Sequence, residues 1–254
     1  MLAKENGLPY ALRVALESGV RSAYRRLAPT GLERVKYKGA ITLTDLPTLI
    51  QEIEAYATRK WRVLIAIAGP PGSGKSTFAA KLETRLGPSA AVMPMDGFHL
   101  ENEQLEHMGL LHRKGAPETF DSEGFVDLVR RLRNEHVISY PTFDREADKT
   151  VPDGGLIGED TKIVLVEGNY LLVSSPPWAA LAPLFDLKIR LQVDLDEIEA
   201  RLISRWLDHG LGPHEARSRA LGNDMQNVHF VEENSRAPDF VLNTGKNIRR
   251  IDTD

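Results

Sequence analysis

The stretch GPPGSGKST, residues 69–77, decides the fold expected of this 254-residue chain. It follows the apolar run RVLIAIA (62–68) and leads into a helix expected over 75–86. Its glycines let backbone N–H groups turn inward around an anion, and the helix adds the positive end of its dipole. The spacing lets an amine reach phosphates and a hydroxyl reach Mg²⁺. The stretch therefore predicts nucleotide binding by Gly69, Pro70, Pro71, Gly72, Ser73, Gly74, Lys75, Ser76 and Thr77, with Ser76 also a metal ligand.

Short apolar runs alternate with helical segments beyond residue 61. The runs at 62–68, 90–95, 162–166 and 187–193 are continuous rather than alternating, which is typical of strands buried on both faces. Helices are expected over 75–86, 122–134 and 195–209, the last with a capping box of Asp194 and Glu197. The alternation predicts an α/β three-layer fold with a mainly parallel sheet.

The first 60 residues are expected to form an N-terminal helical extension to a main domain at 61–254. Helices are expected over 11–27 and 44–60. The first is rich in arginine and could be an organelle-targeting helix or a docked accessory helix, and its interrupting glutamates favour docking.

Composition excludes several classes of protein. The net charge of −4 gives no basic field for nucleic acid or a membrane surface, and the absence of cysteine excludes disulfides and thiolate metal sites. No apolar run approaches the roughly 18 residues of a membrane helix, and no apolar signal-peptide core is seen. We expect a cytoplasmic protein that binds neither nucleic acid nor membrane.

Two carboxylates follow expected strands. Asp96 comes directly after 90–95, and Glu167 directly after 162–166. Ligands of parallel sheets lie beyond the carboxyl ends of the strands, so both acids are expected to face the nucleotide if their strands are neighbours. Asp96 is followed by Gly97 and could also form a turn. Glu167 can bind Mg²⁺ directly or through water.

Further candidates lie in loops and on a basic helix. Arg201 and Arg205 are spaced i, i+4 and project from one helical face, ready to hold phosphate charge in a lid around 201–219. His99 can line an acceptor pocket, whereas Asp121 fits a helix cap better than a substrate contact. Arg113 could meet substrate or only solvent.

Five motifs in order resemble the P-loop kinases of the uridine kinase, phosphoribulokinase and type I pantothenate kinase group. They are GPPGSGKST (69–77, a Walker A motif), MDGFHL (95–100), KGAPETFD (114–121), YPTFDR (140–145) and VEGNYLL (166–172). The resemblance spans about residues 45–243 and is nearest to the bacterial nucleoside- or sugar-kinase-like branch. It implies ATP and Mg²⁺ as cofactors, Asp96 as the base, Glu167 beside the metal, and an arginine-bearing lid near 201–205.

The sequence does not identify the molecule that accepts the phosphoryl group. By the resemblance, Phe143, Asp144 and Arg145 lie in the acceptor pocket, but family members often carry Tyr or His here. We expect a kinase that phosphorylates a hydroxyl of a small polar metabolite, a sugar or nucleoside before pantothenate or a phosphorylated sugar, with a homodimer as one expectation for its assembly. A nucleotide-hydrolysing switch or assembly factor is the alternative, although no Asn/Thr-Lys-x-Asp base-reading motif occurs.

Overall fold

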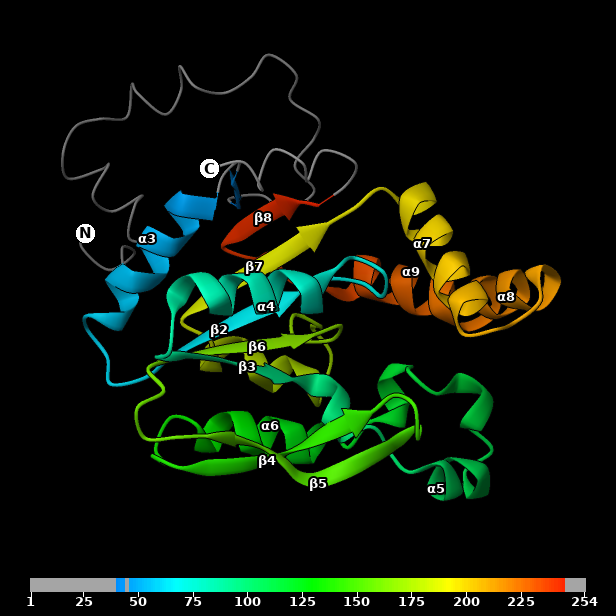
Figure 1. Ribbon diagram of the computed structural model, residues 1–254, viewed down its shortest axis with the longest axis horizontal. Coiled ribbons are helices and arrows are strands. Elements are labelled where there is room, and N and C mark those ends of the chain that lie inside the picture. Colours follow the sequence, from blue (N-terminus) through cyan, green and yellow to red (C-terminus); the bar gives the residue numbers. More distant parts are fainter. Residues whose placement is uncertain (1–39, 44–45, 245–254) are drawn as a thin grey trace, which may run out of the picture.

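A six-stranded parallel sheet forms the centre of the protein. The structure is a computed structural model that describes residues 40–43 and 46–244, so the helix expected over 11–27 lies outside it. The strand order is β1 (Ile41–Leu43), β8 (Phe240–Asn243), β7 (Leu187–Gln192), β2 (Val63–Ala68), β6 (Ile163–Gly168) and β3 (Ala90–Pro94), and every pair is parallel (Figure 1). The predicted parallel α/β sheet is confirmed.

Helices cover both faces of this sheet and make the three layers. Alternate residues of β2 face opposite sides, which is why its whole sequence is apolar. One side packs with α3 (Leu46–Ala57) and α4 (Lys75–Leu86). The other packs with α6 (Ser122–Arg131), the 3₁₀ segment η4 (Trp178–Leu184) and α9 (Met225–Asn234).

The described part of the expected N-terminal extension belongs to the main core. Leu49 and Ile53 of α3 are fully buried in the same cluster as β2 and β7. β1 pairs with β8, which lies near the other end of the sequence. The core therefore shows no break at residue 60, where the extension was expected to end.

A helical subassembly stands beyond one end of the sheet (Figure 1). It consists of α7 (Leu195–Asp208), α8 (Pro213–Arg219), the π-helical turn η5 (Ala220–Asp224) and the start of α9. Its own apolar cluster includes Ile198, Leu202 and Val228. The capping box predicted for α7 is wrong: Asp194 occupies the N-cap position without a side-chain cap bond, and Glu197 instead binds Arg201.

A β-hairpin that the sequence analysis did not predict lies beside β3 and η1 (Met95–Phe98). Its strands β4 (Ile138–Asp144) and β5 (Lys149–Ile157) are antiparallel, with a bulge between Tyr140 and Thr142. Between η1 and α6 run α5 (Asn102–His107) and the short 3₁₀ segments η2 (Leu111–Arg113) and η3 (Pro117–Thr119). The hairpin thus covers the carboxyl end of β3.

Arg62 anchors the opposite end of the sheet. Its side chain is almost fully buried and donates hydrogen bonds to five backbone carbonyls rather than to an acid. The acceptors come from the end of α6 and from the connection between β5 and β6: Leu132, Glu135, His136, Gly158 and Thr161. One guanidinium therefore ties three segments together, and burial lowers its pKa.

Candidate active site

The phosphate loop at 69–74 leads from β2 into α4, as predicted. Gly72 and Gly74 have φ of +77° and +86°, which L side chains rarely adopt, so the loop can curl its N–H groups inward. A Cβ at Gly69 would lie 2.7 Å from the Ser73 Oγ. The Thr244 hydroxyl donates to the Ser73 carbonyl at 3.0 Å and holds the loop from outside. This geometry forms an anion cradle at the N-terminus of α4.

Lys75 lies inside this cradle. Its side chain is buried, and its Nζ donates to the Pro70 carbonyl at 3.1 Å, across the loop. Burial lowers the pKa of the amine, whereas the Glu167 and Asp96 carboxylates raise it and the Arg205 and Arg145 cations lower it further. The predicted amine, both acids and two arginines therefore converge on one point.

Ser76 and Glu167 meet directly, as a shared metal site requires. The Ser76 hydroxyl donates to Glu167 Oε1 at 2.9 Å. Burial raises the pKa of Glu167, while Lys75 and the Ser76 hydrogen bond lower it. Mg²⁺ prefers oxygen ligands and commonly takes one or two carboxylates plus phosphate oxygens and water. The hydroxyl and carboxylate fit that ion, and the strand order explains the meeting because β6 lies between β2 and β3.

Asp96 lies at the carboxyl end of β3, within η1. Its Oδ2 accepts from the Arg145 guanidinium at 2.6 Å. Asp96 and Gly97 lie in the 3₁₀ turn that ends β3, where the His99 N–H donates to the Asp96 carbonyl at 3.2 Å, so the turn that the Asp-Gly pair suggested is present. A Cβ at Gly97 would lie 1.8 Å from the Pro141 carbonyl oxygen, so this glycine is required because β4 crosses close above it. The crossing brings the hairpin, and Arg145 with it, over Asp96.

His99 and Phe143 form an aromatic wall beside Asp96. The His99 ring lies 4.1 Å from Phe120 and 4.7 Å from Phe143 between centroids, and its Nδ1 bonds the Asp96 carbonyl at 2.8 Å. Burial lowers the pKa of His99 more than Asp96 raises it. A neutral imidazole therefore faces this part of the site at neutral pH.

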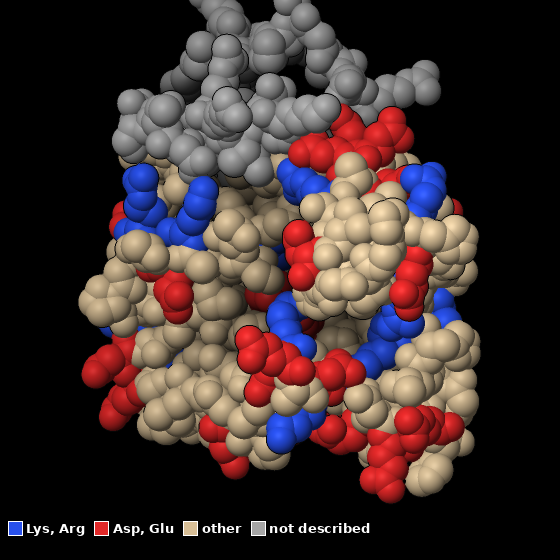
Figure 2. Space-filling model, turned by 45° about the vertical axis from the view of Figure 1, so that its right-hand side comes forward, with Lys and Arg blue, Asp and Glu red and all other residues tan. Residues whose placement is uncertain are grey.

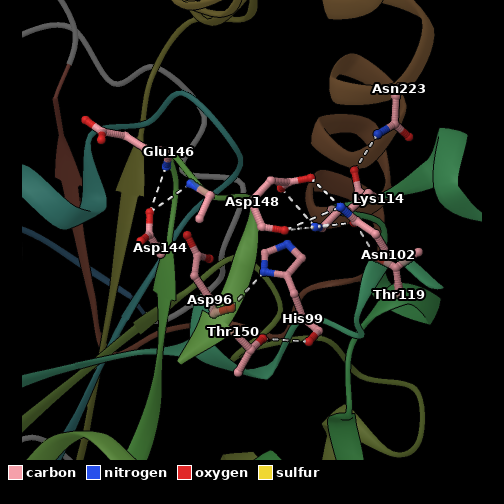
Figure 3. Close-up of polar contacts among 12 residues, drawn as sticks. Asp96, His99, Asn102, Lys114, Thr119, Asp144, Glu146, Asp148, Thr150 and Asn223 are labelled. Carbon is pink, nitrogen blue, oxygen red and sulfur yellow. Dashed lines mark hydrogen bonds and ion pairs between the residues drawn. The ribbon is translucent and has the colours of Figure 1, made fainter. Parts of the chain in front are cut away.

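Lys114 ties the tip of the hairpin to the loop after α5. Its Nζ donates to Asp148 Oδ1 at 2.8 Å and to Asn102 Oδ1 at 2.6 Å. The Asn102 amide also donates to Asp148, and the Lys114 amine lies 5.0 Å from the Phe143 ring. Figure 3 shows Lys114, Asn102 and Asp148 converging near His99. Neither Asn102 nor Asp148 was predicted, because their contacts join distant segments.

Asp144 and Arg145, the two residues of the hairpin tip that were predicted to contact the acceptor, have separate partners. Asp144 Oδ1 accepts from the backbone N–H groups of Glu146 and Ala147, so it shapes the turn (Figure 3). Arg145 pairs with Asp96 rather than with Asp144. These turn-forming hydrogen bonds do not test the substrate contact predicted for Asp144, which stays a prediction.

Arg113 and Asp121 border the same loop. Arg113 donates to Asn223 Oδ1 at 2.8 Å and Gln226 Oε1 at 2.7 Å, and pairs with Glu118. It therefore joins this loop to α9 rather than pointing into solvent. Asp121 accepts from the Gly124 N–H at 3.0 Å, which confirms its role as the cap of α6.

Arg201 lies on the nucleotide side of the phosphate loop. It donates to the Gly72 carbonyl at 3.1 Å, to Glu197 and to the Thr244 carbonyl. A cavity of about 440 Å³ opens beside it, lined by Leu46, Thr77, Lys81, Arg201 and Thr244 among others. Its place next to the anion cradle suits the nucleoside part of a nucleotide.

Arg205 lies one turn further along α7. Its guanidinium pairs with Asp224 at 2.9 Å, and the same Asp224 oxygen accepts from the Trp206 indole at 2.6 Å. Of the two other arginines in the lid segment 201–219, Arg217 pairs with Glu199, whereas the Arg219 guanidinium lies over the Trp206 ring, as that of Arg205 does. Figure 2 shows basic and acidic side chains intermixed around a hollow on this face.

This combination of a glycine cradle, a buried lysine, a hydroxyl–carboxylate pair and an arginine-bearing helix on a parallel sheet defines a P-loop nucleotide-binding protein. The model of the family "Phosphoribulokinase / Uridine kinase" matches residues 64–209. The chain belongs to this family and is a kinase of it.

Relatives agree on the kinase fold and differ in their named substrates. A Schizosaccharomyces pombe protein named "Putative uridine kinase" is 39% identical over 194 residues, covering 71% of this chain and 83% of that protein. A pantothenate kinase of Mycolicibacterium gilvum is 31% identical, covering 57% and 48%. The crystal structure of a "putative fructose transport system kinase" from Silicibacter sp. TM1040 has 44% identity and a TM-score of 0.73, covering 76% of this chain and 97% of that chain.

Within the described ranges, no helix combines the length and apolar character that crossing a membrane requires.

Proposed function

We propose that this kinase transfers the γ-phosphoryl group of ATP, with Mg²⁺, to a hydroxyl of a neutral polyhydroxy metabolite, a sugar or a nucleoside. The observation that carries the proposal is Asp96, which lies at the end of β3 beside the phosphate loop and under the hairpin. Membership of the family supports the transfer of a phosphoryl group. The residues around Asp96 support the choice of a neutral acceptor.

In this proposal each residue has one task. Lys75 and the loop N–H groups hold the β- and γ-phosphates, and Arg201 holds the nucleotide end of the loop. Bound Mg²⁺, held by Ser76 and Glu167, would neutralise phosphate charge. Asp96 orients the acceptor hydroxyl and takes its proton as the new O–P bond forms and the bond from the γ-phosphorus to ADP breaks. Arg205 stabilises the charge on the moving phosphoryl group.

The neutral charge of the acceptor is inferred from how the surrounding charges are compensated. Lys114 is paired with Asp148, Arg145 with Asp96, and Arg113 with Glu118 and two side-chain amides. An anionic acceptor would add negative charge to a site whose cations are already paired with carboxylates, whereas hydroxyl groups add no charge to it. Phe143 and His99 offer ring faces for a base or for the C–H side of a sugar.

A coupled assay of ADP release with ATP and Mg²⁺ tests the proposal. D-Fructose, other hexoses, polyols, uridine and other nucleosides are compared with pantothenate and sugar phosphates at equal concentration. We expect turnover with a neutral compound, and loss of that turnover in Lys75→Ala. A preference for pantothenate or a sugar phosphate would contradict the neutral acceptor, and equal ADP release without any acceptor would favour a nucleotide-hydrolysing switch.

Asp144 variants test whether the hairpin tip reads the acceptor. Asp144→Asn keeps an oxygen for the turn N–H groups, and Asp144→Ala removes it. A raised KM for the acceptor in both variants, with KM for ATP unchanged, would support direct contact. A raised KM in Asp144→Ala alone would assign Asp144 to the turn.

A further inference from the structure

Two adjacent side chains of the π-helical turn η5 reach in different directions. Asn223 contacts the loop at 113–114, on the acceptor side, and Asp224 contacts Arg205 of α7, on the lid side. Both are buried, with exposed fractions of 7% and 8%. π-Turns inside helices are rare and are frequent at functional sites. The turn η5 therefore contacts both the acceptor side and the lid side of the proposed active site.

Asn223 makes two different hydrogen bonds with this loop. Its Oδ1 accepts from Arg113 at 2.8 Å. Its Nδ2 donates to the Lys114 carbonyl at 2.9 Å, the bond drawn in Figure 3. The second bond fixes the backbone of the residue whose amine holds Asp148 at the hairpin tip. A short chain of contacts thus runs from Asn223 through Lys114 to the hairpin that carries Phe143 and Arg145.

Asp224 completes the chain on the lid side. It accepts from both Arg205 and Trp206, so it fixes α7 against η5 at the residue that we assign to transition-state charge. Because Asn223 and Asp224 share one backbone turn, any shift of α7 against η5 would move both side chains. A contiguous hydrogen-bonded path of this kind can couple two sites when its elements move together.

We propose that Asn223 is a positioning residue that couples nucleotide binding at the lid to the closure of the acceptor hairpin, through its hydrogen bond to the Lys114 carbonyl. The inference rests on the proposed function in one respect, that a nucleotide occupies the phosphate loop and lid. It does not depend on which acceptor is used. Asn223 itself touches neither reacting group.

Hydrogen–deuterium exchange with the non-hydrolysable analogue AMP-PNP and Mg²⁺ tests the coupling without an acceptor. In the wild type we expect the nucleotide to slow exchange both in the phosphate loop (69–77) and at the hairpin tip (142–150). The hairpin should slow by about fivefold or more, the lower range of coupling between sites. In Asn223→Ala the loop should still respond and the hairpin should not.

Two further variants separate coupling from simple loosening. Asn223→Asp keeps an acceptor for Arg113 but removes the donor to the Lys114 carbonyl, so it should lose the response as Asn223→Ala does. Asn234→Ala is the matched control, because Asn234 ends α9, the helix that follows η5, and its amide nitrogen bonds only the Phe230 carbonyl in the described structure. It should retain the full response.

Each outcome decides the proposal. If AMP-PNP slows exchange in the phosphate loop of the wild type but not at the hairpin tip, the coupling is refuted and the proposed function is not. If AMP-PNP still slows exchange at the hairpin tip in Asn223→Ala or in Asn223→Asp, residues other than Asn223 carry the coupling. Faster hairpin exchange in Asn223→Ala by the same factor with and without AMP-PNP would leave the response intact and show a merely structural role. No protection of the loop in the wild type would refute the proposed function as well.

Discussion

Asp96 and Gly97 are adjacent residues with separate physical tasks. The carboxylate lies at the carboxyl end of a parallel strand, where open α/β sheets bind their ligands. The glycine is needed because the Pro141 carbonyl lies where a Cβ would be. A dipeptide that usually signals a turn therefore serves both an acid and a close backbone crossing.

Replacing Asp96 with Asn should remove the base while keeping the shape of the side chain. We expect turnover to fall roughly 10²–10⁴-fold, the usual contribution of a positioned base. This corresponds to about 3–5 kcal/mol of barrier. Nucleotide affinity, measured by calorimetry beside the ADP-release assay, should stay within threefold, which is roughly 0.7 kcal/mol. An equal fall in affinity and turnover would instead make Asp96 a binding residue.

His99 should make the folded protein sensitive to mild acid. Its pKa is lowered from the ordinary 6.5 by burial, although Asp96 opposes this and Lys114 and Arg145 add to it. As the pH falls below 6.5, the unfolded chain gains a proton that the folded protein still resists, so the free energy of unfolding decreases.

The measurement compares chemical unfolding of the wild type and His99→Gln across pH. The difference in free energy of unfolding between the wild type and His99→Gln should be constant above about pH 7. Below the ordinary pKa of about 6.5, the wild type should lose stability relative to the variant. His107→Gln, at an exposed position, is the control. A difference that stays flat down to about pH 5 would show that His99 titrates normally.

Both arginines of helix α7 lie on one face of the helix, and the arginines of α8 do not belong to that face. Arg201 and Arg205 face the phosphate loop side, whereas Arg217 of α8 pairs with Glu199 and is 61% exposed. The spacing i, i+4 was enough to predict the shared face. It could not show that Asp224 would fix Arg205, since that partner follows in another helix.

Arg205→Ala should slow phosphoryl transfer more than it weakens ATP binding. Charge on the moving phosphoryl group is largest in the transition state, so we expect a fall in kcat of about 10²-fold or more. KM for ATP should change by less than about threefold, as expected when an interaction forms only in the transition state. Arg217→Ala, on the same lid, should change neither. Equal losses in kcat and affinity with Arg205→Ala would indicate uniform binding.

The elements that sequence patterns missed have a common physical reason. β1 and β8 have only three and four residues, and the hairpin strands contain Pro141, Gly154 and Gly155, which interrupt any alternating pattern. The buried strands were predictable because an apolar run needs no partner to be recognised.

The same distinction holds within the site. The phosphate loop, Asp96 and Glu167 follow from local motifs and from which strand ends meet. Asn102, Asp148 and Asn223 act through contacts with other segments of the chain, such as Asn223 with Lys114. No local residue pattern encodes such a contact.

At the scale of the whole molecule, Arg62 should be a principal determinant of stability. Its removal would leave five carbonyls of two segments, 132–136 and 158–161, without this donor. An unsatisfied buried group costs about 1–3 kcal/mol. We expect Arg62→Met to lower the free energy of unfolding by about 3 kcal/mol or more. The measurement is urea denaturation followed by circular dichroism.

Arg130→Met is the matched control, since Arg130 pairs with Asp127 on an exposed face of α6. Its effect should stay within about 0.5 kcal/mol. If both variants were equally stable, the five hydrogen bonds of Arg62 would contribute no more than solvation does.

The pairing of β1 with β8 also sets the order in which a growing chain can fold. β8 lies between β7 and β1, so Ile41–Leu43 must wait for Phe240–Leu242 before it can join the sheet. Contacts between such distant segments form slowly, and domains emerge during synthesis from their N-terminal end. On the ribosome, the phosphate loop can therefore form before the sheet edge that supports it is closed. Until the last strand emerges, the apolar edge of β7 and the inner face of α3 are the surfaces that a chaperone would meet.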